Sequence, residues 1–405
     1  MFGRQNLALT FILLTVTLDA IGIGIIFPVM PDLMMQVTHG SLAQAAVWGG
    51  VIVTSFAVMQ FLCGPIVGNL SDRYGRRPVL LVSVAVMAAD YVVMALAQTV
   101  WLLLITRMIN GISSATQSTT SAYVADISAP DDRARRFGLI GAGFGIGFVA
   151  GPIIGGLVAG IDARAPFWVA AGLGAANFLF GFFALPESLP ADRRRPFSLA
   201  RANPLSSFAA IRKLPGLRRL LLVSFIYALT FNVWPAIWSY YGHEAFNWSA
   251  QWIGISLAVF GLGMAFVQAV LMGPIVRLLG ERRTAEVGMT LEVVTYVFYG
   301  LVTSGFWALA ATPLTSVGGI AGPALQGMMS RATPEDQQGE LQGINTSLNA
   351  MAMILAPLVM TSIFAFFTSP SAPIHLPGAP FLLSAVLMVA AVAVFVAGTR
   401  EKPTP

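Results

Sequence analysis

LVSVAVMAADYVVMALAQ, residues 81–98, is apolar almost throughout and carries one aspartate, Asp90, near its middle. Its length matches the roughly 20 residues that an α-helix needs to cross a bilayer. The next stretch, VWLLLITRMINGISSA (residues 100–115), is similarly apolar and contains Arg107. A charged side chain in the hydrocarbon centre costs roughly 2.5–3.5 kcal/mol on insertion scales, and such side chains usually face a cavity or a partner. We therefore predict two membrane-spanning helices, each with a charge that must be explained.

The whole chain has the composition of a polytopic membrane protein. Of its 405 residues, 56% are hydrophobic and only 10% are charged, against about 25% charged in soluble domains. No apolar segment alternates with polar residues as barrel strands do, so we expect an all-α membrane protein with twelve transmembrane helices. The predicted spans are 7–30, 44–68, 78–98, 101–124, 137–160, 165–185, 217–241, 250–272, 285–304, 306–330, 342–367 and 378–398.

Targeting, disulfide and metal signals are weak. The N-terminal apolar stretch is too long for a cleavable signal and lacks an A-x-A-like site, so we interpret it as the first span. The single cysteine, Cys63, excludes an intramolecular disulfide. The three histidines, His39, His243 and His375, fall near span ends, and no Cys/His cluster has metal-ligand spacing. We expect no permanently bound metal or cofactor.

The basic residues predict the orientation. With the N-terminus inside, 21 of the 23 Lys and Arg residues fall in cytoplasmic segments, the exceptions being Arg107 and Arg164. The positive-inside rule then places both termini in the cytoplasm. The net charge of +5 suits anionic lipid at the inner face and needs no nucleic-acid partner.

The polar segment 186–216 divides the spans into two groups of six. We expect an N-terminal six-helix bundle at 1–185, a cytoplasmic linker at 186–216 with one amphipathic helix on the membrane, and a C-terminal six-helix bundle at 217–405.

The two halves also repeat a motif. GNLSDRYGRR (68–77) follows span 2, and GPIVRLLGERR (273–283) follows span 8. Each copy has two glycines seven residues apart, with the copies 205 residues apart: Gly68 and Gly75, then Gly273 and Gly280. The second copy has Arg277 where the first has Asp72, so the two segments cannot act identically. A weak internal repeat is typical of transporters with a substrate site near the bilayer midplane.

These motifs resemble a known family. GNLSDRYGRRPVLL resembles the loop 2–3 signature of the major facilitator superfamily. GFGIGFVAGPIIGG (143–156) is similar to the fifth-span signature of its drug/proton antiporters, and LDAIGIGIIFPVMP (18–31) to the first-span signature of the twelve-helix branch. GPALQGMMS (322–330) and QGELQG (338–343) extend the likeness into the second half. Within the superfamily, the chain resembles the tetracycline/proton antiporter group.

The resemblance implies the major facilitator fold, with two pseudo-symmetric bundles that rock about a central cavity. It implies efflux of a hydrophobic, often cationic drug in exchange for protons, across the inner membrane of a bacterium. In the tetracycline group the cargo is a drug–divalent metal chelate, so Mg²⁺ would travel with the substrate. We expect a monomer in the lipid bilayer, driven by the proton gradient.

Three carboxylic acids lie in the interior of predicted spans: Asp19, Asp90 and Glu292. At about 1.5 Å per residue, Asp90 lies roughly 20 Å from the inner boundary and Arg107 roughly 10 Å from the outer one. These depths coincide in a core ~30 Å thick, so the two side chains could pair. The pair is either a static lock between spans 3 and 4 or a protonatable site tuned by Arg107. The resemblance favours coupling, because the tetracycline antiporters carry acids at all three positions, with aspartate at that of Glu292.

One position departs from the family. In span 8 the family has a histidine implicated in proton coupling, where this chain has Met264, which cannot carry a proton. Coupling then rests on the carboxylates, or the cargo is not tetracycline. Gln268 and Gln60 match polar residues of the family. A buried glutamine needs hydrogen-bond partners, so each either contacts cargo or bonds a neighbouring helix.

The segment 68–77 is the candidate gate, with Gly68, Asp72, Arg73, Gly75, Arg76 and Arg77. We interpret Asp72 as following a helix end, and the glycines as allowing close approach and a sharp turn. In the family this aspartate lies by the N-terminus of span 11, whose dipole favours an anion, and that contact would hold the cytoplasmic side shut. Asp126, at the inner end of span 4, would join the cluster. A solvated basic turn explains the arginines but neither Asp72 nor the glycine spacing.

Two further groups carry structural expectations. In span 5, Gly143, Gly147, Gly151 and Gly155 recur every four residues beside Pro152, so they share a helix face on which another helix can pack closely. We expect that span 5 meets span 8. In span 7, Phe231 and Trp234 are candidates for stacking on a flat drug, whereas Trp238, Tyr240 and Tyr241 fit an interfacial belt.

The sequence therefore favours a proton-driven efflux antiporter and not an enzyme. Proton and cargo charge would be carried by Asp19, Asp90 and Glu292, with Arg107 tuning Asp90. A proton-coupled importer or exporter of a metabolite remains open on the same fold, as does a sensor that does not transport. An intramembrane enzyme would need a metal cluster or an activated nucleophile in the spans, and the sequence shows neither. The sequence also has no G-x-x-x-x-G-K-[ST] motif, which argues against transport driven by ATP.

Overall fold

The computed structural model describes residues 2–114, 116–128, 132–198, 203–204, 211 and 214–399. Within these ranges all regular secondary structure is helical. Ten helical segments there are long and apolar enough to cross a membrane. One of them, 250–301, contains two predicted spans, and the shorter apolar helix at 100–113 belongs to another, so the twelve predicted spans are all present.

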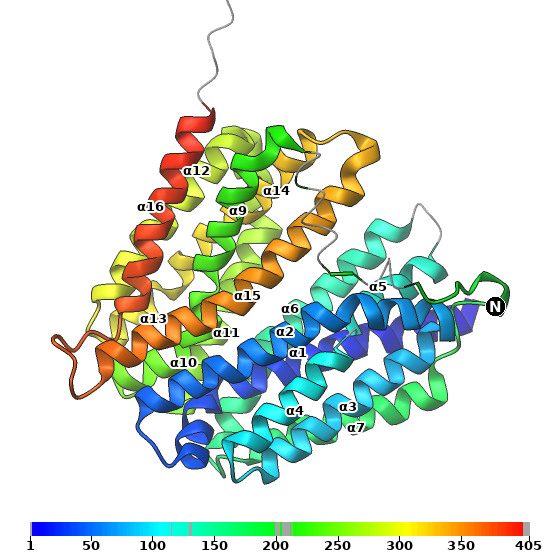
Figure 1. Ribbon diagram of the computed structural model, residues 1–405, viewed down its shortest axis with the longest axis horizontal. Coiled ribbons are helices and arrows are strands. Elements are labelled where there is room, and N and C mark those ends of the chain that lie inside the picture. Colours follow the sequence, from blue (N-terminus) through cyan, green and yellow to red (C-terminus); the bar gives the residue numbers. More distant parts are fainter. Residues whose placement is uncertain are drawn as a thin grey trace, which may run out of the picture. The chain divides into compact units, whose positions relative to one another are not determined.

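The first half (Figure 1) contains α1 (Phe2–Thr38), α2 (Leu42–Tyr74), α3 (Arg76–Leu96), α4 (Val100–Ser113), α5 (Thr116–Ile127), α6 (Arg133–Ala159) and α7 (Ala165–Ala184). The second half contains α9 (Arg218–Phe231), α10 (Val233–Phe246), α11 (Ala250–Phe266), η5 (Val267–Leu271), α12 (Met272–Leu301), α13 (Gly305–Thr315), η6 (Ser316–Ile320), α14 (Ala321–Arg331), α15 (Gln338–Thr368) and α16 (Ala379–Thr399). Residues 199–202, 205–210 and 212–213 of the linker lie outside the described ranges, and its amphipathic helix stays a prediction.

Several spans that hydropathy predicts as continuous are interrupted. Span 4 consists of α4 and α5, and span 7 consists of α9 and α10, which meet at Asn232. Span 10 changes to a 3₁₀ turn at SVGGI (316–320), which begins three residues after Pro313 of α13. Span 8 ends in a π-helical turn at 267–271. Interruptions of this kind free backbone groups at membrane depth and are frequent at transporter binding sites.

The chain divides into two compact units. One comprises Met1–Gly40, Val51–Pro204 and Ser249–Ala258, and the other Ser41–Gly50, Leu205–Trp248 and Val259–Pro405. The first turns of α2 thus pack with the second-half helices, and the first turns of α11 with first-half helices. Glycines make both packings close: a Cβ on Gly49 would collide with the Tyr240 hydroxyl, and one on Gly254 with the Pro152 carbonyl oxygen.

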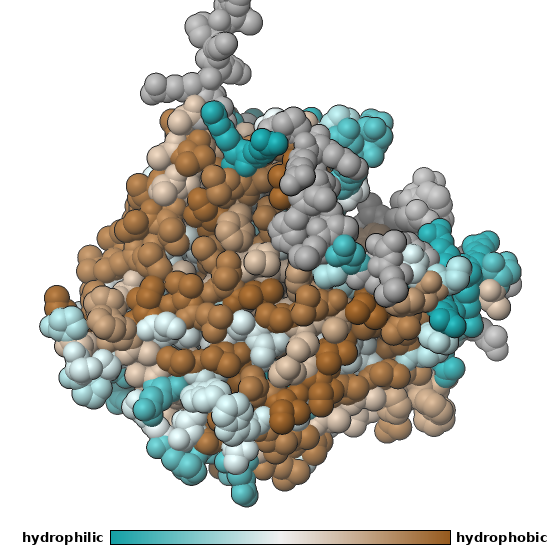
Figure 2. All heavy atoms as spheres, in the orientation of Figure 1, coloured by the Kyte–Doolittle hydropathy of each residue, from teal (hydrophilic) through white to brown (hydrophobic). Residues whose placement is uncertain are grey.

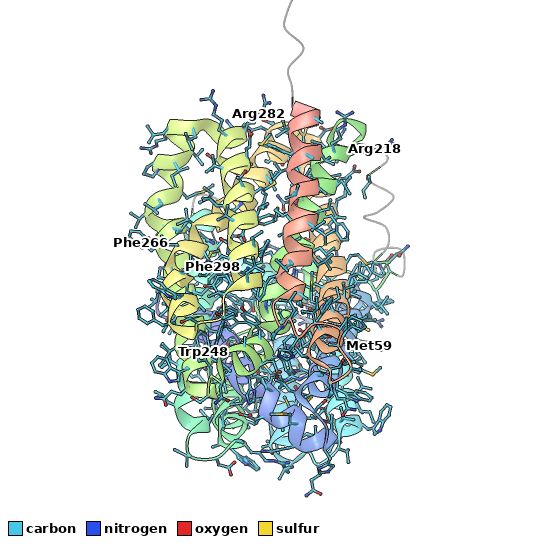
Figure 3. All side chains as sticks on the ribbon, turned by 90° about the vertical axis from the view of Figure 1, so that its left-hand side faces the viewer. Met59, Arg218, Trp248, Phe266, Arg282 and Phe298 are labelled. Carbon is cyan, nitrogen blue, oxygen red and sulfur yellow. The ribbon has the colours of Figure 1, made fainter. Side chains whose placement is uncertain are left out.

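The surface is that of a protein that lies in a bilayer. Large apolar side chains such as Phe183, Leu278 and Phe306 are more than 70% exposed, which soluble proteins avoid in contiguous patches. Hydrophobic residues cover most of the face seen in Figure 2. In the second unit, Arg218 and Arg282 lie at one end and Trp248 at the other, with Phe266 and Phe298 between (Figure 3). The chain is a multi-pass membrane protein.

Candidate functional site

The first-half acid lies between α3 and α4. Asp90 is only 3% exposed, and its Oδ2 accepts a hydrogen bond of 2.7 Å from Asn110 Nδ2. The same oxygen is 3.5 Å from Arg107 Nε. Arg107 and Asn110 are three residues apart, which places them on one face of α4. The structure therefore brings Asp90 and Arg107 together as the depth estimate predicted, and adds Asn110.

Asp19 reaches the same region from α1. It is half-buried, and both Asp19 and Asp90 act electrostatically on the Tyr91 hydroxyl. One turn further along α1, a Cβ on Gly22 would collide with that hydroxyl. The close approach of α1 to Tyr91 thus brings two of the three predicted acids into one neighbourhood, in the first unit.

The third acid, Glu292, is 2% exposed in α12 of the second unit. A Cβ on Gly318 would lie 2.8–2.9 Å from its Oε1, Cδ and Cγ atoms. A Cβ on Gly319 would lie 2.7 Å from Met264 Sδ, and one on Gly322 would lie 3.1 Å from the Tyr227 ring. Three glycines at and after η6 therefore leave space for three long side chains from α12, α11 and α9.

Three of the four candidate cavity residues lie in three different environments. Gln60 donates a hydrogen bond of 2.9 Å to Ser114 Oγ at the end of α4. Of the two alternatives for this glutamine, the structure therefore shows the hydrogen bond to a neighbouring helix. Gln268 is exposed in the π turn. Phe231 is half-buried and stacks on Tyr227 with ring centroids 6.0 Å apart. Because Tyr227 lies in the Glu292 neighbourhood, the exposed part of the Phe231 ring leaves surface there for a ligand.

Trp234 lies in a dense aromatic cluster. It is 9% exposed and packs on the rings of Trp238, Phe260, Tyr296, Tyr299 and Phe381, at centroid distances of 4.9–6.0 Å. This packing leaves it little surface for a drug in the present structure.

The prediction of an interfacial belt in span 7 is wrong. Trp238, Tyr240 and Tyr241 are 4%, 4% and 1% exposed, and Tyr241 Oη donates 2.5 Å to the Tyr299 carbonyl. Belt residues would face the lipid headgroups, whereas these three face other helices. Aromatic composition near a span end does not reveal which side of the helix is buried.

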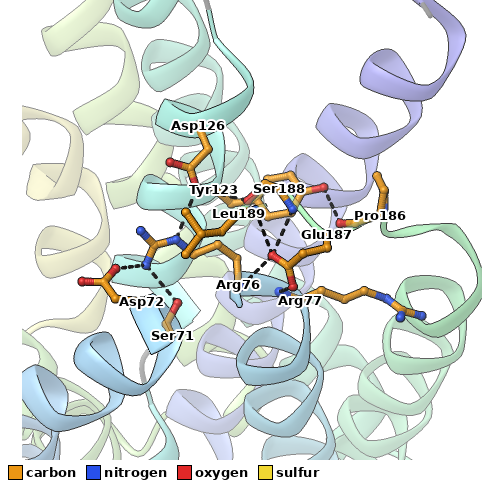
Figure 4. A network of polar contacts seen from close by, with 10 residues as sticks. All are labelled: Ser71, Asp72, Arg76, Arg77, Tyr123, Asp126, Pro186, Glu187, Ser188 and Leu189. Atoms are coloured by element: carbon orange, nitrogen blue, oxygen red, sulfur yellow. Dashed lines mark hydrogen bonds and ion pairs between the residues drawn. The ribbon is translucent and has the colours of Figure 1, made fainter. Parts of the chain in front are cut away.

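The candidate gate cluster assembles around Arg76 (Figure 4). Its Nη1 is 2.6 Å from Asp72 Oδ1 and 3.0 Å from Ser71 Oγ, and its Nε is 3.3 Å from Asp126 Oδ2. Asp126 thus lies in the cluster where the sequence placed it. Asp72, however, does not follow a helix end, because α2 continues to Tyr74. The segment expected to be a loop is helical up to a single-residue turn.

That turn is Gly75, at φ +105°, a conformation that favours glycine. Gly75 offers no side chain to cap α3, and Glu187 caps it instead. The Glu187 carboxylate accepts hydrogen bonds from the backbone N–H groups of Arg76 (2.8 Å) and Arg77 (3.2 Å). Sequence reasoning missed Glu187, whose only signal was an acid directly after the predicted sixth span.

The side chains of the remaining gate candidates make other contacts. The Arg77 guanidinium donates 2.6 Å to the Phe182 carbonyl oxygen, and Arg73 lies 5.1 Å over the Tyr74 ring. A Cβ on Gly68 would have no neighbour within 4 Å. Gly68 therefore makes no close approach in this structure, contrary to expectation.

The second half repeats the cluster with its charges exchanged. Gly280 has φ +73°, and the next residue, Glu281, pairs with Arg331, whose Nε donates 3.0 Å to Glu281 Oε2. Gly280, Glu281 and Arg331 lie 205 residues after Gly75, Arg76 and Asp126 respectively. The internal repeat thus extends from the sequence motif to the turn and its ion pair.

The span-5 glycines pack on α1 and not on span 8. A Cβ on Gly147, Gly151 or Gly155 would meet backbone atoms of residues 17–25, whereas Gly143 faces Thr17 more loosely. Span 8 meets the adjacent face: Gly156 lies against Ala250 and Gln251, and Pro152 against Gly254. The fourfold glycine face was predicted correctly, and span 5 does meet span 8, but through Pro152 and Gly156, whereas the glycine face itself packs on α1.

The chain is similar to proteins of one known family. A model of the Major Facilitator Superfamily matches residues 12–241 and 219–405. The chain is 44% identical to a class C tetracycline resistance protein of Escherichia coli, covering 89% of this chain and 91% of that protein. It is 39% identical to a class G tetracycline resistance protein of Vibrio anguillarum, over 87% and 89%.

A human relative, major facilitator superfamily domain-containing protein 10, is 31% identical over 79% of this chain and 74% of its own. Its solved structure, described as an organic anion transporter, matches with TM-score 0.70 and 26% identity over 96% and 99% of the two chains. A nucleoside transporter, NupG, matches with TM-score 0.78 at 13% identity over 98% and 100%, which bears on fold alone.

Proposed function

Because this chain belongs to the major facilitator superfamily, we propose that it is a proton-coupled efflux antiporter. Its first candidate cargo is a tetracycline–divalent metal chelate, moved by alternating access between six-helix bundles at 1–185 and 217–405. We place it in a bacterial inner membrane as a monomer with both termini cytoplasmic. The tetracycline resistance proteins among its relatives support the class of cargo.

One observation carries the proposal: Asp90 is a buried acid with a basic partner at membrane depth. Antiport requires that proton and cargo not be bound together. A carboxylate meets this condition, since it accepts a proton or balances a positive charge but does not do both. Protonation of Asp90 would also weaken its attraction to Arg107, which gives the two states different contacts, as any driven conformational change requires.

A second candidate is transport of an organic anion. It is favoured by the relative described as an organic anion transporter and by Met264 in place of the family's histidine. Arg107 is the one basic residue in the interior of the predicted spans, since Arg218 and Arg219 lie at the start of 217–241. It would then bind the anionic cargo and release its contact with Asp90.

The test is transport by the purified full-length protein in proteoliposomes under an imposed pH gradient. Tetracycline is offered with and without Mg²⁺, and aromatic organic anions are offered in parallel. We expect gradient-driven tetracycline movement that needs Mg²⁺ and is lost in Asp90→Asn. Movement of organic anions alone would establish the second candidate, and equal tetracycline transport by wild type and Asp90→Asn would contradict the first.

A further inference from the structure

Asp90 uses its two carboxylate oxygens unequally. Oδ2 receives the Asn110 amide at 2.7 Å and faces Arg107 Nε at 3.5 Å. Oδ1 is buried and has no hydrogen-bond partner among the described residues. A buried carboxylate oxygen without a partner is costly in an apolar setting, and it is also an available position for a proton.

The donor itself is held firmly. Asn110 is 7% exposed, and the next residue, Gly111, lies against α2, where a Cβ would meet the Phe56 carbonyl oxygen at 2.5 Å. Ser83 of α3 donates 2.6 Å to the Ser113 carbonyl oxygen of α4. These contacts fix the C-terminal turn of α4 against α2 and α3, so the amide of Asn110 is directed at Asp90 by the backbone around it.

We propose that Asn110 is a positioning residue of the coupling site, which anchors Asp90 Oδ2 so that the proton is taken up at Oδ1. The proposal rests on the proposed antiport at Asp90. In the step, one O–H bond forms at Oδ1 with a proton from the aqueous phase, Asp90 becomes neutral, and no other bond changes. Asn110 needs only to retain its hydrogen bond, since the bound oxygen is an acceptor in both states.

The ionisable groups around Asp90 are few. Arg107 faces it from α4. Tyr91 is its neighbour on α3, and Asp19 of α1 acts electrostatically on Tyr91. Helix α7 carries no ionisable residue, and those of α5 are Tyr123 and Asp126 near its cytoplasmic end. Asn110 is the one uncharged donor to the carboxylate among the described residues, so its removal changes the balance between the charged and neutral forms without removing a charge.

The test uses Asn110→Leu, which removes the donor with little change in volume, and Asn110→Gln, which keeps it. Asn177→Leu is the matched control, because Asn177 is a 1% exposed asparagine in α7 that bonds Thr15 and not Asp90. The measurement is the pH dependence of tetracycline–Mg²⁺ counterflow in proteoliposomes. Without the donor the carboxylate is less favoured, so we expect the Asn110→Leu midpoint to move upward by about one to two pH units. Asn110→Gln and Asn177→Leu should stay near wild type.

A profile of Asn110→Leu that coincides with wild type would overturn the proposal. If that variant does not exchange, the Asp90 carboxyl is titrated by infrared difference spectroscopy of the purified protein, with its band assigned by loss in Asp90→Asn. The same upward shift is expected, and an unshifted band overturns the proposal. Absence of tetracycline exchange by wild type would instead count against the proposed function, and the infrared titration still decides the role of Asn110.

Discussion

At the scale of single residues, the second-half acid depends on missing side chains. Glutamate at position 292 extends one methylene further than aspartate, and Gly318 leaves the space into which its carboxyl reaches. Gly319 does the same for Met264. The size of the pocket around Glu292 is therefore set by the 3₁₀ turn opposite it.

Gly318→Ala should displace the Glu292 carboxyl, because its Cβ would lie within 2.9 Å of three Glu292 atoms. Overpacking of this kind costs about 1–3 kcal/mol, which corresponds to a fall of roughly fivefold or more in the initial transport rate. Gly319→Ala is the control, since it meets only the flexible end of Met264. Gly318→Ala combined with Glu292→Asp should recover part of the rate. A double variant no better than Gly318→Ala would contradict this account.

At the scale of helices, the start of α3 is capped from outside its own segment. Glu187→Ala removes the acceptor for the first two backbone N–H groups of α3, those of Arg76 and Arg77, and for those of Ser188 and Leu189. Loss of a cap costs about 0.5–2 kcal/mol, so the Tm of the purified protein in detergent should fall by roughly 1–4 °C. Glu335→Ala changes an exposed acid of the second half and should leave Tm unchanged. An equal fall in both variants would show that the cap contributes nothing specific.

The Glu281–Arg331 pair has the charges of the Arg76–Asp126 pair in reverse. We therefore predict that a double charge reversal in the second half compensates for the loss caused by either single reversal. Glu281→Arg or Arg331→Glu alone places like charges together at the second turn. Since Arg331 is 70% exposed, the pair is worth at most about 1 kcal/mol, so we expect initial transport rates to drop about two- to fivefold. The double variant Glu281→Arg/Arg331→Glu restores opposite charges with the polarity of Arg76 and Asp126, and should recover most of the rate. A double variant as slow as the slower single variant would contradict the repeat.

Hydropathy and the repeat predicted much at this scale, for identifiable reasons. Span lengths follow from bilayer thickness, and the Gly75 and Gly280 turns follow from glycine spacing. The breaks at Ser114 and Asn232 could not be predicted, because neither residue is a strong helix breaker and tertiary packing decides there. The α1 partner of the span-5 glycines was equally hidden, since a fourfold pattern defines a face but not what covers it.

At the scale of the whole molecule, the acids are distributed between the two units. Asp19 and Asp90 lie in the first, and Glu292 in the second. Depth along a span identified the Asp90–Arg107 pair, because that pair joins neighbouring spans. Asn110 was missed because hydropathy does not give the rotation of α4 about its axis, which decides the face that meets Asp90. Glu187 was missed because hydropathy does not show which distant segment folds back to the start of α3.

The central claim is that carboxylic acids buried in the spans exchange protons for cargo. Its most direct test compares wild type with Glu292→Gln in proteoliposomes, measuring tetracycline–Mg²⁺ accumulation against a concentration gradient under an imposed pH gradient. Glutamine keeps the shape and cannot take up a proton at this site, so we predict that uphill accumulation is lost while downhill counterflow persists. Uphill accumulation by Glu292→Gln at the wild-type level would contradict the account.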